Sequence, residues 1–312
     1  MSTSPIPRPS GSAFHRRDLL RATAAGVAMS ATGSARQDSP AAAPRERAFK
    51  KSLKFGMVDT EGSVLEKFEL LKRVGFDGVE LDSPSGLDTD EVLEARDATG
   101  FLIPGVIGSA RWAATLGDRD PDVRAIGRLG LESAISECKL FGGETVSLAP
   151  AVVNQDISYD DAWERSQVEL QGVLPHAQRT GIKLALENGW NHFLLSPLEA
   201  ARYVDLLNSD AVGWHLDIGN VVNYGWPEQW VRILGARLLR IDLKDFSRSR
   251  RDTEGLWKGF DVKLGDGDCD WSALMAALDD VDYRGWASAE VEGGGEERLR
   301  EIAERMDSLL LS

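Results

Sequence analysis

Short apolar runs recur along the chain from about residue 50 onwards, and a turn and a longer stretch with helical spacing follow most of them. Runs of four to eight mainly apolar or β-branched residues are typical of strands, and apolar residues three or four apart are typical of helices. Eight strand-like runs are present, at residues 53–59, 76–82, 101–108, 144–150, 182–188, 212–219, 238–245 and 286–292.

Four of the intervening segments carry clear helix signals. At one of them Ser196 can cap the helix, Pro197 fits the first helical position, and Glu199 can complete a capping box. The other three helices are predicted over 121–141 (with Ile126, Leu129, Ile135, Cys138 and Phe141 near helical spacing), from Pro227 through Trp230 and Ile233, and over 295–310.

Alternation of strand and helix eight times predicts the α/β class and a single-domain (β/α)8 TIM barrel over residues 50–312. The rival architecture is a doubly wound open sheet. That fold would need a glycine-rich phosphate loop after an early strand, and neither "GFDGVEL" nor "GDGDCDW" has the G-x-G-x-x-G spacing.

The N-terminal segment differs in composition from the rest. "HRRDLLRATAAGVAMSATGSA" pairs Arg16 with Arg17, continues with a mildly apolar run and ends in small residues, which is typical of a twin-arginine signal peptide over residues 1–35. Residues 36–49 are expected to be a linker. The run is too short and too weakly apolar for a membrane anchor, so we expect an exported, periplasmic protein with no anchor after cleavage. A disordered basic tail is the alternative.

Charge and cysteine content narrow the classes of partner. The formal net charge is −14, which disfavours binding to nucleic acid or to anionic membranes. The two cysteines, Cys138 and Cys269, lie in a predicted helix and in a Gly/Asp-rich loop. We expect free thiols rather than a disulfide.

Polar side chains gather on the inward face of the last four predicted strands. Alternate residues of a barrel strand face the interior, and active sites lie at the carboxyl ends of the strands. Along 238–245, Leu239, Ile241 and Leu243 share one face, which leaves Asp242 and Lys244 on the inward face. The same rule turns inward Glu187 of the fifth strand, His215 and Asp217 of the sixth, and Ser288, Glu290 and Glu292 of the eighth.

Converging carboxylates repel one another in a partly dry cavity. A divalent cation among them would relieve the repulsion. The alternative is a network of ion pairs that closes the barrel top, with Lys244 and Arg240 as partners.

Five motifs carry a resemblance to a known family: "ENGWNHFLLSP" (187–197), "WHLDIGNVVNYG" (214–225), "LKDF" (243–246), "GDGDCDW" (265–271) and "GWASAEVEGG" (285–294). The chain resembles the sugar phosphate isomerase/epimerase family of the xylose isomerase-like TIM barrel superfamily. The resemblance implies a divalent metal held by Glu187, Asp217, Asp242 and Glu290. At 242 the family usually has His, and at 220 Asn stands where some ketose epimerases have a catalytic His.

The same resemblance implies proton abstraction from a carbon next to a carbonyl, with Glu187 and Glu290 as the catalytic carboxylates on opposite sides of the sugar. An all-oxygen ligand set favours Mn²⁺ or Mg²⁺. Lys244 is placed to offset the excess negative charge. The candidate substrate-binding residues are Lys244, Arg248, Asn188, Asn220, His192 and Glu80.

Several of these residues have simpler interpretations. Glu80 equally suits a buried, hydrogen-bonded carboxylate. His215 is favoured as a buried histidine rather than a ligand, and His176 as structural or exposed. The loop tryptophans Trp112, Trp190 and Trp226 could stack on a sugar, although packing at the barrel rim is commoner.

The combined prediction is a metal-dependent sugar isomerase or epimerase with a small-molecule sugar substrate. The protein is expected to act as a single chain or as a homo-oligomer. Export favours an unphosphorylated ketose or keto-sugar. Two alternatives stay open: a lyase or hydrolase of 3-keto-glycosides on the same barrel, and a non-catalytic sugar-binding barrel without metal.

Overall fold

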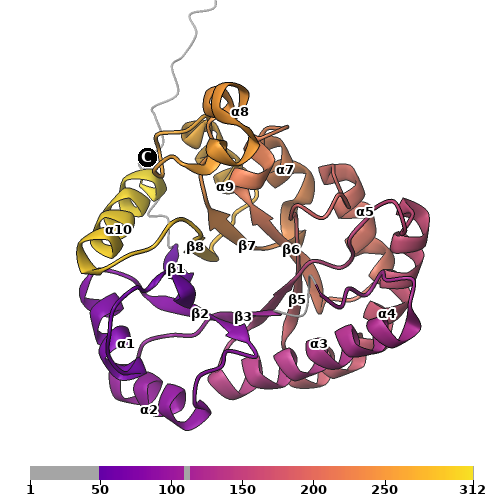
Figure 1. Ribbon diagram of the computed structural model, residues 1–312, viewed down its shortest axis with the longest axis horizontal. Coiled ribbons are helices and arrows are strands. Elements are labelled where there is room, and N and C mark those ends of the chain that lie inside the picture. Colours follow the sequence, from indigo (N-terminus) through magenta and orange to yellow (C-terminus); the bar gives the residue numbers. More distant parts are fainter. Residues whose placement is uncertain (1–48, 109–112, 312) are drawn as a thin grey trace, which may run out of the picture. The chain divides into compact units, whose positions relative to one another are not determined.

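The computed structural model describes residues 49–108 and 113–311. Within them, eight parallel strands form a closed barrel in sequence order, which confirms the predicted (β/α)8 fold (Figure 1). The predicted signal peptide, the linker up to residue 48, and Trp112 lie outside the described residues. The strands are β1 (Lys50–Lys54), β2 (Gly78–Ser83), β3 (Gly105–Gly108), β4 (Thr145–Leu148), β5 (Lys183–Glu187), β6 (Val212–Asp217), β7 (Leu238–Leu243) and β8 (Trp286–Ala289).

Helices surround the strands (Figure 1). The longer ones are α1 (Val64–Arg73), α2 (Thr89–Thr99), α3 (Pro121–Phe141), α4 (Tyr159–Thr180), α5 (Pro197–Leu207), α7 (Pro227–Leu234), α9 (Trp271–Asp280) and α10 (Glu296–Leu310). Shorter pieces are η1 (Phe55–Met57), α6 (Ile218–Val222), η3 (Gly235–Arg237), α8 (Arg248–Glu254) and η4 (Leu256–Phe260). In the described part of the chain, no helix combines the length and the apolar character that a membrane crossing requires.

Helix starts follow local side-chain chemistry. The hydroxyl of Ser196 accepts a hydrogen bond from the backbone N–H of Glu199, and Pro197 opens α5, as predicted. The α3 helix spans the predicted residues, but Ile126 and Leu129 are 59% and 60% exposed, so they lie off its buried face.

Strand ends differ from the prediction at both ends of the chain. The first strand ends at Lys54 because Phe55–Met57 turn into η1, and the last ends at Ala289, so Glu290 and Glu292 lie beyond it. The third begins only at Gly105, directly after Pro104, which has no N–H to donate to a sheet. The hydrophobic pattern therefore predicts which segments form strands, whereas local chain geometry determines the residues at which these strands begin and end.

The two faces of the strands differ in polarity. The outward residues Leu184, Trp214 and Ile241 are fully buried under the helices. Inward positions hold buried polar side chains instead, and neighbouring strands align them: Lys54 pairs in register with Glu80, and Asp217 with Asp242. The barrel interior is therefore a layered polar core.

Both cysteines are free and buried, as expected from the sequence. Burial raises the pKa of the Cys138 thiol to about 12. A thiol of this kind stays protonated and chemically inert.

One buried carboxylate fixes the loop that follows β7. Asp245, 1% exposed, accepts hydrogen bonds from the backbone N–H groups of Phe246, Gly265, Gly267 and Cys269 and from the Trp271 indole. A Cβ on Gly267 would lie 2.1 Å from Asp245 Oδ1, so glycine is required there. The "GDGDCDW" motif thereby wraps around the end of β7.

We expect Asp245→Asn to lower the free energy of unfolding by about 2–4 kcal/mol. Hydrogen-bond donors approach both carboxylate oxygens of Asp245. In either orientation of the substituted amide, its NH₂ group would face an N–H donor, and the hydrogen bonds on that side would be lost. Chemical denaturation measures the loss. The control is Asp266→Asn, whose side chain is 55% exposed and paired only with Arg305 at 3.2 Å; it should cost less than about 1 kcal/mol. Equal stability of the two variants would contradict this role for Asp245.

Candidate active site at the barrel mouth

Four carboxylates meet at the carboxyl ends of β5 to β8. Glu187 and Asp217 are the last residues of β5 and β6, Asp242 lies in β7, and Glu290 follows β8. One carboxylate oxygen from each lies within 4.8 Å of those of the other three. The geometry brings together the four residues that the sequence predicted as ligands.

Two asparagines hold Asp217 in place. The Asn188 amide donates to the Asp217 carbonyl at 2.8 Å and accepts from the Asp217 N–H at 3.0 Å. Asn220 donates its N–H to Asp217 Oδ1 at 3.0 Å and its side-chain amide to the Asn188 carbonyl at 3.0 Å. Their amides join the ends of β5 and β6. Substrate binding by these two residues, which was expected from the sequence, stays a prediction.

Lys244 bridges two of the four carboxylates. Its Nζ lies 3.2 Å from Asp217 Oδ2 and 3.1 Å from Glu290 Oε2. Burial acts to lower the pKa of Lys244, but the charges of Asp217 and Glu290 outweigh it and raise that pKa. Burial would raise the pKa of Glu290, and the Lys244 ammonium lowers it overall. The predicted neutralising role of Lys244 fits this placement.

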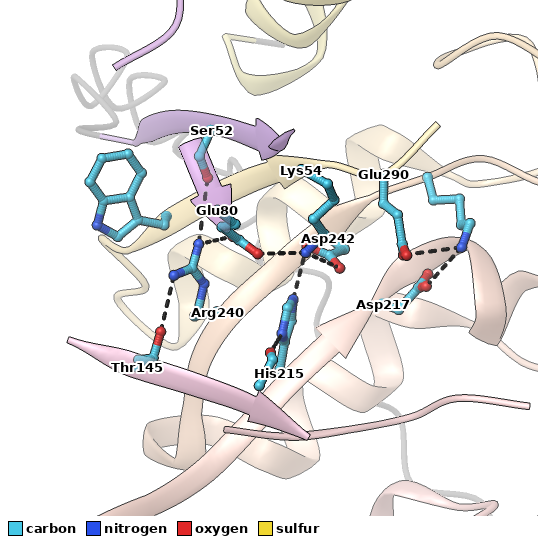
Figure 2. Close-up of polar contacts among 12 residues, drawn as sticks. Ser52, Lys54, Glu80, Thr145, His215, Asp217, Arg240, Asp242 and Glu290 are labelled. Atoms are coloured by element: carbon cyan, nitrogen blue, oxygen red, sulfur yellow. Dashed lines mark hydrogen bonds and ion pairs between the residues drawn. The ribbon is translucent and has the colours of Figure 1, made fainter. Parts of the chain in front are cut away.

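A second ammonium group, that of Lys54 on β1, was not identified from the sequence. Its Nζ donates to Glu80 Oε2 at 2.6 Å and to Asp242 Oδ1 at 2.9 Å (Figure 2). Although burial acts to lower the pKa of Lys54, Asp242 and Glu80 raise it. The strand alternation that placed the late carboxylates inward also places Ser52 and Lys54 inward, so the signal was present in the first strand.

Glu80 on β2 is a counter-ion deep in the barrel. It is 2% exposed and accepts from Lys54 and from Arg240, whose guanidinium also donates to Thr145 Oγ1 at 3.0 Å. Burial would raise the pKa of Glu80, but Arg240 and Lys54 lower it. Both oxygens serve buried cations, which agrees with the alternative of a buried, hydrogen-bonded carboxylate; the substrate contact at Glu80 stays a prediction.

His215 is a buried supporting residue, as favoured from the sequence. Its Nε2 lies 2.9 Å from Asp242 Oδ1, and its Nδ1 shares a hydrogen bond with the Ser147 hydroxyl. Burial acts to raise the pKa of Asp242, but His215 and Lys54 hold it well below its usual range. The pKa of Asp217 shifts in the opposite direction: burial raises it, although the nearby Lys244 ammonium acts to lower it.

Arg248 lies at the rim and does not point into the site. Its Nε donates to the Val222 carbonyl at 2.9 Å, its Nη2 donates to the Gly225 carbonyl at 2.9 Å, and the guanidinium lies over the Trp226 ring. These contacts fix the loop after β6, and the substrate contact at Arg248 stays a prediction. His192 is exposed, with Nδ1 3.4 Å from the Val153 carbonyl.

Aromatic residues form one wall of the rim. Trp190 packs against Trp257 with ring centroids 4.6 Å apart and against Phe260 at 5.7 Å. Phe260 also lies beneath the Lys244 ammonium, 5.0 Å from its ring centroid. Rim packing, the commoner fate of such tryptophans, accounts for Trp190.

The charges of this cluster fit a divalent cation. Five carboxylates (Glu80, Glu187, Asp217, Asp242 and Glu290) stand against the three basic side chains Lys54, Arg240 and Lys244, so carboxylates outnumber lysine and arginine by two. Within the described residues, Asp242 Oδ2 is buried without a hydrogen bond, although Lys54 Nζ lies 2.9 Å from it. Carboxylate oxygens are the ligands that Mg²⁺ and Mn²⁺ prefer.

Comparison with known proteins agrees with this geometry. The sequence pattern described as the xylose isomerase-like TIM barrel matches residues 68–309. The chain belongs to this family. The matched residues include strands β2 to β8.

Sugar epimerases are among the proteins similar to this xylose isomerase-like barrel. A putative L-ribulose-5-phosphate 3-epimerase of Escherichia coli (strain K12) is 27% identical over 239 residues, which cover 70% of this chain and 80% of that protein. The solved 3-keto-D-glucoside 4-epimerase of E. coli superposes with a TM-score of 0.70 at 20% identity, over 84% and 98% of the two chains. A solved D-psicose 3-epimerase superposes with a TM-score of 0.68 at 18% sequence identity, over 85% of this chain and 100% of that chain. The curated relatives support an enzyme of the isomerase class, and the solved structures support the fold.

The contact between Lys54 and Asp242 can be measured with a double-mutant cycle. Lys54→Met removes the ammonium shared by Glu80 and Asp242, which leaves Glu80 with Arg240 and Asp242 with His215, and should cost roughly 3–5 kcal/mol of unfolding free energy. Combined with Asp242→Asn, the loss should be smaller than the sum of the single losses by about 1–3 kcal/mol.

Chemical denaturation of the metal-free protein measures all four corners. The matched control is the exposed pair Lys263 and Glu301, 2.5 Å apart, for which the same cycle should give less than about 1 kcal/mol. Additive losses at Lys54 and Asp242 would show that the two side chains are not coupled.

Proposed function

We propose that this protein is a divalent-metal-dependent epimerase or isomerase that acts on an unphosphorylated ketose or keto-sugar by moving a proton next to a carbonyl. The observation that carries the proposal is the convergence of Glu187, Asp217, Asp242 and Glu290 within 4.8 Å at the barrel mouth. Membership of a barrel family with sugar epimerases among its relatives supports the same reaction class.

The proposed roles follow from where the side chains start. Glu187 ends β5 and Glu290 follows β8, so the two carboxylates approach the mouth from strands on different sides of the ring. One would take the proton from the carbon next to the carbonyl and the other would return it from the opposite face. Lys244, beside Glu290, would donate a hydrogen bond to a substrate oxygen.

The metal would be held by Glu187, Asp217, Asp242 and Glu290, with Mg²⁺ or Mn²⁺ favoured by the all-oxygen set. When bound, it would supply a Lewis acid that draws electrons from the substrate carbonyl. The asparagine pair that joins β5 to β6 would keep Asp217 aimed at this position.

An unphosphorylated substrate is supported by the pairing of the cations around the mouth. Lys244 is paired with Asp217 and Glu290, and Arg248 with backbone carbonyls. A phosphate would need cations that are free to meet it. We also propose that the enzyme is exported through its predicted twin-arginine signal, and export favours an unphosphorylated substrate. Fractionation of cells that express the full chain would test this location.

Metal binding is the first test of this function. After treatment with a chelator, addition of Mn²⁺ or Mg²⁺ at about 100 times Kd should stabilise the protein by about 2.7 kcal/mol, which raises Tm by roughly 5–10 °C. Glu187→Gln should lose most of the rise, and the exposed control Glu297→Gln should keep it. Absence of any response to either metal would leave the non-catalytic barrel as the better interpretation.

Proton chemistry is the second test. In D₂O the metal-loaded protein should exchange the hydrogen next to the carbonyl of a keto-sugar without cleaving the glycosidic bond. Glu290→Gln should slow this exchange by about a hundredfold or more, because a general acid–base group contributes at least that factor. NMR of the sugar measures both the incorporation of deuterium and the integrity of the glycosidic bond. Cleavage in place of exchange would favour the lyase or hydrolase alternative, and full exchange in the variant would rule out the assigned role of Glu290.

A further inference from the structure

A cleft leads outward from the carboxylate cluster. It has a volume of about 890 Å³, begins at Lys244 and Glu290, and passes between residues 260–263 and α10. We call it the outer cleft; it is lined by Lys244, Phe260, Asp261, Val262, Lys263, Glu290, Val291, Glu292, Arg298 and Glu301. Its volume is near the upper end of the range for pockets that enclose drug-sized ligands, roughly 300–1,000 Å³. One hexose ring at the carboxylates would leave most of it empty.

Three charged side chains of the outer cleft, Lys263, Arg298 and Glu301, are paired with one another. Arg298 donates to Glu301 Oε2 at 2.9 Å and to the Glu292 carbonyl at 3.2 Å. Lys263 lies 2.5 Å from Glu301 Oε1. Such groups are held in place and keep further donor and acceptor positions, and the carboxylates of the lining outnumber its cations. This surface suits hydroxyl groups and disfavours an anion.

Apolar surface lies beside these polar groups. Val262, Val291 and Phe260 line the cleft, and the Lys244 ammonium lies over the Phe260 ring. Trp257 packs against Phe260 with ring centroids 6.3 Å apart, and Trp257 is 61% exposed. An apolar strip flanked by donors and acceptors matches a pyranose, which has apolar C–H faces and a polar edge.

We propose that the outer cleft is a subsite for a second sugar ring, so that the substrate is a keto-disaccharide or a similar keto-glycoside rather than a free ketose. The inference rests on the proposed function for the position of the reacting ring, which places the keto ring at Glu290. The glycosidic bond then points outward, and the second ring lies against Val262 and Val291 with its hydroxyl groups toward Arg298 and Glu301.

The test compares a keto-disaccharide with the corresponding keto-monosaccharide on the metal-loaded full chain. The kcat/KM for hydrogen exchange should be at least about tenfold higher for the disaccharide. Val262→Trp, which fills the cleft, should remove that preference. Val168→Trp is the matched control, because Val168 is 66% exposed on α4 and away from the cleft lining; it should keep the preference. Equal rates for the two sugars, or an unchanged preference in Val262→Trp, would overturn the proposal.

A binding measurement separates this proposal from the proposed function. Saturation-transfer NMR with cellobiose, which has no keto group, should show contact to both rings in the unaltered protein and loss of contact to one ring in Val262→Trp. If no sugar undergoes exchange but this pattern is seen, the subsite stands and the epimerase function fails. If exchange occurs on the monosaccharide and cellobiose shows no cleft-dependent contact, the subsite fails and the function stands.

Discussion

Alternation of buried charge along the barrel interior is the constraint on which the rest of the structure depends. Arg240, Glu80, Lys54 and Asp242 follow one another from the centre of the barrel toward its mouth, each bound to the next (Figure 2). An isolated buried ion would cost several kcal/mol, so each member of this chain is stable only because its neighbours are present. Parallel pairing supplies that order, because register places Lys54 opposite Glu80.

The loops around the mouth are fixed by backbone-directed side chains. Asn188 and Asn220 tie the end of β5 to that of β6, Arg248 holds the loop after β6, and Asp245 gathers the loop before α9. Each bonds to backbone atoms, and Asn188, Asn220 and Asp245 also accept a hydrogen bond from a tryptophan indole. The four carboxylates therefore stand on a frame that is fixed by hydrogen bonds within the chain.

Much of this could be predicted from the sequence. The eight-fold rhythm and the inward face of β5 to β8 follow from side-chain periodicity alone, and they were enough to identify Glu187, Asp217, Asp242 and Glu290. Periodicity gives the face on which a residue lies but not its partner. For this reason Glu80 and Arg248 were expected to meet substrate, whereas the structure pairs them with Arg240 and with backbone carbonyls.

Lys54 was overlooked for a different reason. Its partner Asp242 is 188 positions away, and barrel closure brings β1 back toward β7 across β8. No local pattern encodes that meeting. Strand ends at Lys54 and Ala289 were likewise set by turns that follow, not by the apolar pattern.

The position of Lys244 between Asp217 and Glu290 has a consequence for metal binding at the mouth. Its ammonium contacts two of the four carboxylates that would hold a metal, so the fold itself supplies a cation at this position. A divalent metal held by the four carboxylates would share the oxygens of Asp217 and Glu290 with Lys244. The affinity of the site for a metal would therefore depend on how firmly the Lys244 ammonium is held between these carboxylates and the Phe260 ring.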